Sequence, residues 1–236
     1  MTSDITYFNL GGHQTGSVSG YVGMTYGRTA SSEMYGLVLM EPTKFLEESA
    51  DMSFIAMYAT PEGIVAGADT LVLKYTGTHG HMHKIFSVLD GKAVIVIAGQ
   101  MTYGDSHKPF SEIINGIKAT TVSSFISKMY DTMKREPVKI CTDIFIAGYD
   151  NAKLVTGHIG GNEGWSVRSI KANTPTYSGA YWATHYAASC SFPTYDIEGM
   201  KNHIHTLITK ICEVDKALDF IDNTVGGNAE IITVYP

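Results

Sequence analysis

The chain of 236 residues is 44% hydrophobic and 17% charged, a composition that excludes a disordered or fibrous protein. Its 17 basic and 23 acidic side chains give a net charge of −6. This balance argues against a nucleic-acid or anionic-membrane binder, because such proteins cluster lysines and arginines. The length is that of one domain, or of two small ones.

The sequence predicts neither a membrane span nor a secretory signal. Its best apolar run, 93–98, is strand-sized and far shorter than the roughly 20 residues of a membrane span. The first residues lack the basic start and apolar stretch of a secretory signal. The three cysteines (Cys141, Cys190 and Cys212) form no CxxC motif, which favours reduced thiols. We therefore expect a cytoplasmic protein, present also in the nucleus if its source is eukaryotic.

The first 52 residues differ in composition from the rest. Glycine, serine, threonine and tyrosine dominate 11–36, where Arg28 and Glu33 are the only charged residues. Such a composition favours turns and irregular backbone. We interpret 1–52 as an extension, which serves as a propeptide, an assembly arm or a partner-contacting tail. The alternative is that it forms an integral part of a single domain.

Two hairpins are predicted next. The apolar runs 53–60 and 63–70 are separated by a Pro-Glu turn, and 84–90 and 92–99 flank the turn dipeptide Asp90-Gly91. A helix follows, beginning near Pro109 and ending before Pro137. Its apolar residues recur at helical spacing and define one buried stripe. They are Val122, Phe125, Ile126, Met129, Tyr130 and Met133.

The second half repeats the pattern of strands followed by helices. Strands are predicted at 140–148, 153–159 and 165–170, and a helix begins after Ser178-Gly179. A long helix over 196–220 and a strand over 230–234 complete the chain. Blocks of hairpins alternating with helices predict an α+β protein, with antiparallel sheets and helices packed outside them.

Common catalytic signatures, such as a phosphate-binding loop or a GxSxG motif, are absent. A set of spaced residues remains. Asp69 follows Ser53 by 16 residues, Lys84 follows Asp69 by 15, and a second hairpin ends at Gly99. Later in the chain come a Ser-Gly step in TYSGA and an aspartate before a Gly-Gly pair in FIDNTVGGNAEIITV. Over about 52–234 this order resembles the proteasome β-subunit family of N-terminal-nucleophile hydrolases.

The resemblance implies a four-layer αββα sandwich over 53–236 and a nucleophile exposed by removal of 1–52. In this family the side-chain hydroxyl of the N-terminal residue attacks a peptide carbonyl, and the α-amine of the same residue acts as the base. Ser53 occupies the nucleophile position. Asp69 would hold Lys84, whose ammonium would lower the pKa of the neighbouring amine and hydroxyl.

The resemblance also assigns three supporting residues. The Gly99 N–H would face the developing oxyanion. Ser178 and Asp222 would orient the terminal amine. No cofactor or metal is implied. The expected partners are other proteasome-type subunits, in a homo- or hetero-oligomeric ring, and the expected substrate is a peptide or unfolded protein.

Three departures from the family pattern keep a second function open. Met52 replaces the glycine at the cleavage site, Leu71 replaces an arginine, and Val225 replaces the serine before Gly-Gly. These changes favour a non-catalytic β-type subunit, retained unprocessed as a structural component of a ring. A third hypothesis rests on HGHMH, whose alternating histidines would share one face of an extended strand and bind a metal. Gly80 and the following Lys84 favour a loop there instead.

Overall fold

The computed structural model describes residues 27–28, 34–35, 53–73, 79–99, 101–103, 108–135, 142–160, 165–190, 196–217 and 225–236. Most of the 1–52 segment thus lies outside the described residues. Within it, two short strands pair antiparallel, β1 (Gly27–Arg28) and β2 (Met34–Tyr35).

One antiparallel sheet of four strands has the order β14-β3-β4-β15. Its strands are β3 (Phe54–Ala59), β4 (Ile64–Asp69), β14 (Thr176–Gly179) and β15 (Ala229–Val234). The first predicted hairpin, β3–β4, is confirmed, and both of its strands are buried along their whole length. The Thr60 hydroxyl fixes the turn by accepting hydrogen bonds from the N–H groups of Glu62 and Gly63.

The other large sheet is also antiparallel and has the order β13-β12-β11-β8-β7. Its strands are β7 (Ile85–Val88), β8 (Ala93–Gly99), β11 (Thr142–Asp150), β12 (Lys153–Gly160) and β13 (Ser166–Arg168). The second predicted hairpin is confirmed as β7–β8. Its turn needs left-handed backbone at Asp90 and Gly91, with φ of 55° and 83°.

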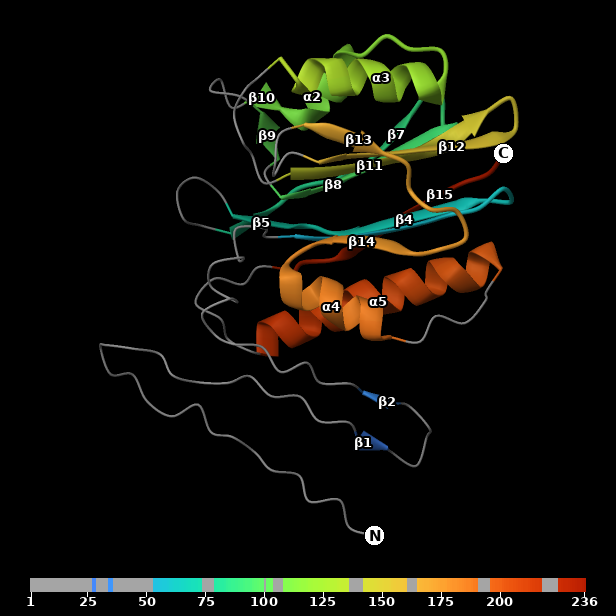
Figure 1. The fold of residues 1–236 in the computed structure, drawn as a ribbon. Coiled ribbons are helices and arrows are strands. Elements are labelled where there is room, and N and C mark those ends of the chain that lie inside the picture. Colours follow the sequence, from blue (N-terminus) through green and yellow to red (C-terminus); the bar gives the residue numbers. More distant parts are fainter. Residues whose placement is uncertain are drawn as a thin grey trace.

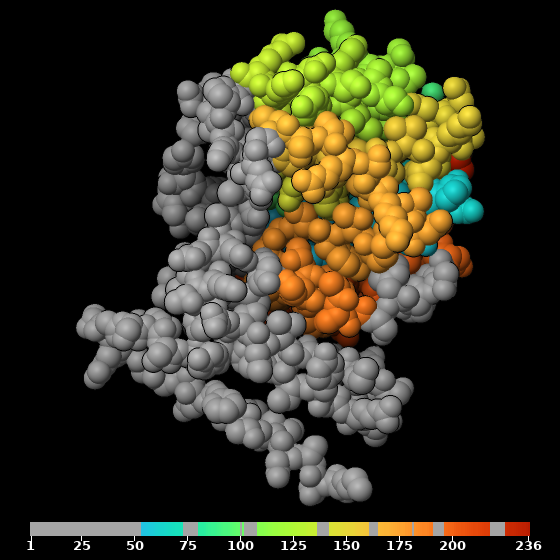
Figure 2. All heavy atoms as spheres, in the orientation of Figure 1, coloured from blue at the N-terminus to red at the C-terminus, as the bar shows by residue number. Residues whose placement is uncertain are grey.

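Helices cover the outer faces of both sheets (Figure 1). Helices α2 (Phe110–Gly116) and α3 (Val122–Met133) pack on the five-stranded sheet, and α4 (Tyr181–Ser189) and α5 (Ile197–Ala217) on the four-stranded one. A third apolar cluster lies between the two sheets. Figure 2 accordingly shows α2 and α3 at one end of the molecule, α4 and α5 towards the other, and little of the cyan β3–β4 hairpin. The prediction of antiparallel sheets with helices outside is confirmed.

The single helix predicted between Pro109 and Pro137 was wrong, because two helices occupy that stretch. Ile117 adopts an extended conformation after α2, and Thr121 is extended before α3. The Thr121 hydroxyl accepts a hydrogen bond from the Ser124 N–H, and the Ser124 hydroxyl accepts one from the Thr121 N–H. This capping box starts a new helix. The apolar stripe of α3 is buried as predicted.

Five further strands were not predicted. The Ser-Gly step forms strand β14 rather than a connection before a helix. The histidine-containing segment, expected as a loop, forms β6 (His79–His81), which pairs with β5 (Leu71–Leu73). Short strands β9 (Thr102–Tyr103) and β10 (Lys108–Pro109) also pair with each other. Across the part of the chain that the structure describes, no helix is long and apolar enough to span a membrane.

Asp150 caps helix α3 from the end of β11. Its carboxylate accepts hydrogen bonds from the Val122 N–H (2.6 Å), the Ser123 N–H (3.0 Å) and the Ser123 hydroxyl (2.6 Å). Burial raises the pKa of Asp150, but these hydrogen bonds outweigh it and hold the pKa below its ordinary value.

We expect Asp150→Asn to lower the free energy of unfolding by about 1 kcal/mol, as loss of a helix cap does. Because the folded pKa is depressed, the stabilisation is present above the unfolded pKa of about 4 and is lost as pH falls through the folded value. Urea denaturation at pH 7 and at pH 3 checks this. Equal differences between variant and wild type at both pH values would contradict it.

Candidate active site

A buried ion pair joins the two sheets. Asp69 ends β4, Lys84 immediately precedes β7, and their side chains are 0% exposed. One carboxylate oxygen of Asp69 lies 2.8 Å from Lys84 Nζ and accepts a second hydrogen bond, also of 2.8 Å, from the Phe54 N–H. The other oxygen accepts hydrogen bonds from the N–H groups of Leu71 (3.2 Å) and Gly226 (3.1 Å). Four donors therefore fix this carboxylate.

Burial dominates the electrostatics of the pair. Desolvation raises the pKa of Asp69, against the attraction of Lys84 and the hydrogen bonds that Asp69 accepts. Desolvation likewise lowers the pKa of Lys84, against the attraction of Asp69. Burial and the mutual attraction of the two groups therefore act in opposite directions on both pKa values.

Ser53 is completely buried and immediately precedes β3. The residue after it, Phe54, donates its N–H to Asp69, so the ion pair holds the backbone next to Ser53. The Ser53 carbonyl accepts a hydrogen bond of 2.8 Å from the Ala180 N–H. Gly179, with φ of +121°, passes so close to this carbonyl that no side chain fits there.

The structure brings Gly99 and Ser178 to the same end of the sheets. Gly99 is the last residue of β8 and has φ of +86°. Ser178 lies in β14, opposite Ile55 of β3. Its hydroxyl donates a hydrogen bond to Asp143. Asp222 lies outside the described residues, so its predicted role remains a prediction.

Asp143 and His158 were not predicted as site residues. One Asp143 carboxylate oxygen accepts the Ser178 hydrogen bond, and the other lies 2.6 Å from His158 Nε2. Burial raises the pKa of Asp143, but the hydrogen bonds from His158 and Ser178 outweigh it and lower the pKa below its ordinary value. The sequence offered one signal, an aspartate at the start of an otherwise apolar strand. Its partners depend on strand pairing, which the sequence alone does not reveal.

A second buried carboxylate, also unpredicted, holds the Gly-Gly segment. Asp215 of α5 is 0% exposed and accepts a hydrogen bond of 3.1 Å from the Val225 N–H. Val225 is itself buried, and Gly226 follows it with its N–H on Asp69. Helix α5 is thus linked through Val225 and Gly226 to the ion pair.

Two histidines of HGHMH, His81 and His83, make separate contacts. His81 Nδ1 lies 3.1 Å from the Thr70 hydroxyl, and His83 Nδ1 lies 2.7 Å from a Glu230 carboxylate oxygen. Among the described residues, no group of three histidine, cysteine, aspartate or glutamate side chains is placed to hold a metal ion.

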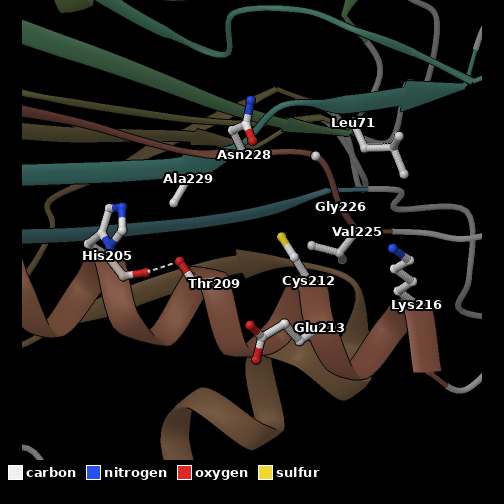
Figure 3. A pocket seen from close by; sticks show the side chains of 11 residues that line it. Leu71, His205, Thr209, Cys212, Glu213, Lys216, Val225, Gly226, Asn228 and Ala229 are labelled. Atoms are coloured by element: carbon white, nitrogen blue, oxygen red, sulfur yellow. Dashed lines mark hydrogen bonds between the residues drawn. The ribbon is translucent and has the colours of Figure 1, made fainter.

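A pocket of about 610 Å³ lies between α5 and the segment that leads into β15 (Figure 3). Cys212 lines it, and burial together with the nearby Asp69 raises the pKa of the Cys212 thiol to about 12. Leu71 and Gly226 belong to the wall and donate their N–H groups to Asp69. The remaining lining residues are His205, Thr209, Glu213, Lys216, Val225, Gly227, Asn228 and Ala229.

Comparison with known proteins identifies the fold. No protein-family model matches the chain. No curated protein matches it either. Among solved structures, eukaryotic HslV from Trypanosoma brucei superimposes with a TM-score of 0.51 at 16% identity, covering 78% of this chain and 99% of HslV. The chain therefore shares the fold of HslV.

Proposed function

We propose that 53–236 form an αββα N-terminal-nucleophile hydrolase domain, which acts as a proteasome-like peptidase subunit after removal of 1–52. One observation carries the proposal. The buried Asp69–Lys84 pair joins the two sheets and binds the backbone N–H directly after Ser53. The HslV-like fold supports it. Within this fold the Phe54 N–H and Lys84 both bind Asp69.

The proposed chemistry follows from these positions. Cleavage after Met52 frees the α-amine of Ser53, which takes the proton of the Ser53 hydroxyl as that oxygen attacks a peptide carbonyl. The Lys84 ammonium favours the neutral amine and the alkoxide, and the Gly99 N–H donates to the oxyanion. The peptide C–N bond breaks, and the leaving amine takes the proton from the Ser53 ammonium. Water then hydrolyses the resulting ester.

A non-catalytic β-type subunit is the second candidate. Val225 and Leu71 support it, because neither side chain supplies the polar group expected at its position. Leu71 contributes to this site through its backbone N–H alone, and its side chain lines the pocket. In this case the chain would keep 1–52 as an arm within a ring of proteasome-type subunits. In either case we propose an oligomeric ring as the assembled form.

Intact mass and peptide hydrolysis distinguish the two candidates. We expect the assembled protein to lose 1–52 and to hydrolyse peptides, and Ser53→Ala to abolish both, with a loss of at least about 10³-fold in hydrolysis. Ser53→Thr is the matched control, because it keeps the hydroxyl and should keep activity. A full-length mass in an assembly whose activity belongs to other subunits would identify the structural subunit instead.

A further inference from the structure

We propose that Asp143 and His158 are positioning residues for the Ser53 amine and act through the Ser178 hydroxyl. The proposal rests on the proposed function, because it assigns the amine of Ser53 as the base. It adds a carboxylate and an imidazole that the resemblance did not supply. The three side chains form one continuous hydrogen-bonded chain, from Ser178 through Asp143 to His158.

The chain of hydrogen bonds lies between the two sheets. Side chains alternate along a strand, and Phe145, two residues after Asp143, belongs to the apolar cluster between the sheets. Asp143 therefore faces the four-stranded sheet, from which Ser178 reaches it. The His158 ring stands edge-on to the Phe145 ring, with ring centres 4.9 Å apart. Phe145 thus packs the imidazole in place beside the carboxylate.

The same end of the fold carries the proposed nucleophile. Strand pairing sets Ser178 opposite Ile55 and Gly179 opposite Phe54. Ser53 directly precedes Phe54 and is therefore close to Ser178. Asp143 pairs with Ala98, the neighbour of the proposed oxyanion glycine. Asp143 and His158, the dyad, therefore lie at the same end of the fold as the proposed nucleophile and the proposed oxyanion donor.

The hydrogen bond that Ser178 donates to Asp143 orients the Ser178 hydroxyl. A hydroxyl has one donor and two acceptor lone pairs, and Ser178 gives its donor to Asp143. Its oxygen is then restricted to accepting. A neutral Ser53 amine can donate one N–H to that oxygen and keep its own lone pair for the proton of the Ser53 hydroxyl. Without Asp143, the Ser178 hydroxyl could donate to the amine lone pair and block the base.

His158 fixes the carboxylate by binding its other oxygen. Both side chains are mostly buried, with 20% of Asp143 and 28% of His158 exposed. The groups that act on Asp143 are His158 of β12, Ser178 of β14 and the charge of Arg168 in β13. All three stabilise the ionised carboxylate, and the pKa of Asp143 is lowered accordingly. Asp143 thus remains an acceptor at neutral pH.

The test uses the processed, assembled protein and the pH dependence of kcat/KM for a peptide substrate. We expect Asp143→Asn to lower kcat/KM by about 10- to 100-fold, the usual loss when an outer hydrogen-bond partner is removed. Its acidic limb should move to lower pH, because removing a negative charge near the amine lowers the pKa of that amine. His158→Gln, which keeps an N–H donor, should retain more activity than His158→Ala.

Two comparisons isolate the role of Asp143. Asp150→Asn, at the opposite end of the same strand, should leave kcat/KM and its pH profile unchanged. If Asp143 acts through Ser178, the double variant Asp143→Asn/Ser178→Ala should lose no more activity than Ser178→Ala alone. Additive losses, or a wild-type pH profile in Asp143→Asn, would overturn the role of the dyad and leave the proposed function intact. Absence of hydrolysis in the processed wild type would overturn both.

Discussion

Replacing Lys84 with methionine should lower the free energy of unfolding by about 3–5 kcal/mol, the usual cost of removing one partner from a buried ion pair. The Asp69 carboxylate would remain buried, with its three backbone donors but without its counter-ion. Methionine has a similar length, so loss of charge rather than a cavity dominates the effect. Urea denaturation at pH 7 measures it.

The matched control is Lys201→Met. Lys201 pairs with Glu198 on the exposed surface of α5, at 3.2 Å, and its removal should change stability by less than about 1 kcal/mol. Adding Asp69→Asn to Lys84→Met should cost less than the two single losses combined, because the two groups interact directly. Equal losses for Lys84→Met and Lys201→Met would show that the buried pair does not stabilise the junction of the sheets.

Gly179→Ala should distort the backbone next to Ser53. Its φ of +121° is strained for any other residue, and an added Cβ would collide with the Ser53 carbonyl and approach Phe54 Cα to 3.0 Å. We expect a stability loss of about 2–5 kcal/mol from backbone strain and overlap together. In protein that still folds, the displacement of Ser53 should reduce hydrolysis by about 100-fold.

Gly116→Ala provides the control for that substitution. Gly116 is the last residue of α2, and a Cβ there would meet nothing within 4 Å. Alanine favours helix, so stability should change by no more than about 1 kcal/mol in either direction. Thermal denaturation and peptide hydrolysis of both variants check the contrast. A stable, fully active Gly179→Ala would show that the close approach to Ser53 is unimportant.

Local patterns predicted most of the elements. The dipeptide Asp90-Gly91 defined the β7–β8 hairpin, because few other residues accept left-handed backbone at a two-residue turn. The apolar stripe from Val122 to Met133 marked the buried face of α3, because residues at helical spacing lie on one side of a helix. The break before α3 was missed. A threonine within a helical pattern acts as a cap only when its hydroxyl accepts a hydrogen bond from the backbone N–H three residues later, as Thr121 does from Ser124.

The site was predictable in part. Ser53, Asp69 and Lys84 lie on adjacent segments of two hairpins, so their spacing was informative about their proximity. Asp143 and His158 meet Ser178 only through pairing between distant strands and packing between sheets. No short-range pattern encodes such contacts. Asp222 lies outside the described residues, and its part in the site stays a prediction.

The most direct measurement is covalent labelling of the assembled protein with an electrophilic peptide inhibitor that bonds the hydroxyl and the α-amine of an N-terminal nucleophile. Mass spectrometry should find the inhibitor on Ser53, at the N-terminus of a chain that begins there, and Ser53→Ala should not be labelled. A chain that keeps 1–52 and carries no label at Ser53, in an assembly that hydrolyses peptides, would contradict the proposed role of Ser53.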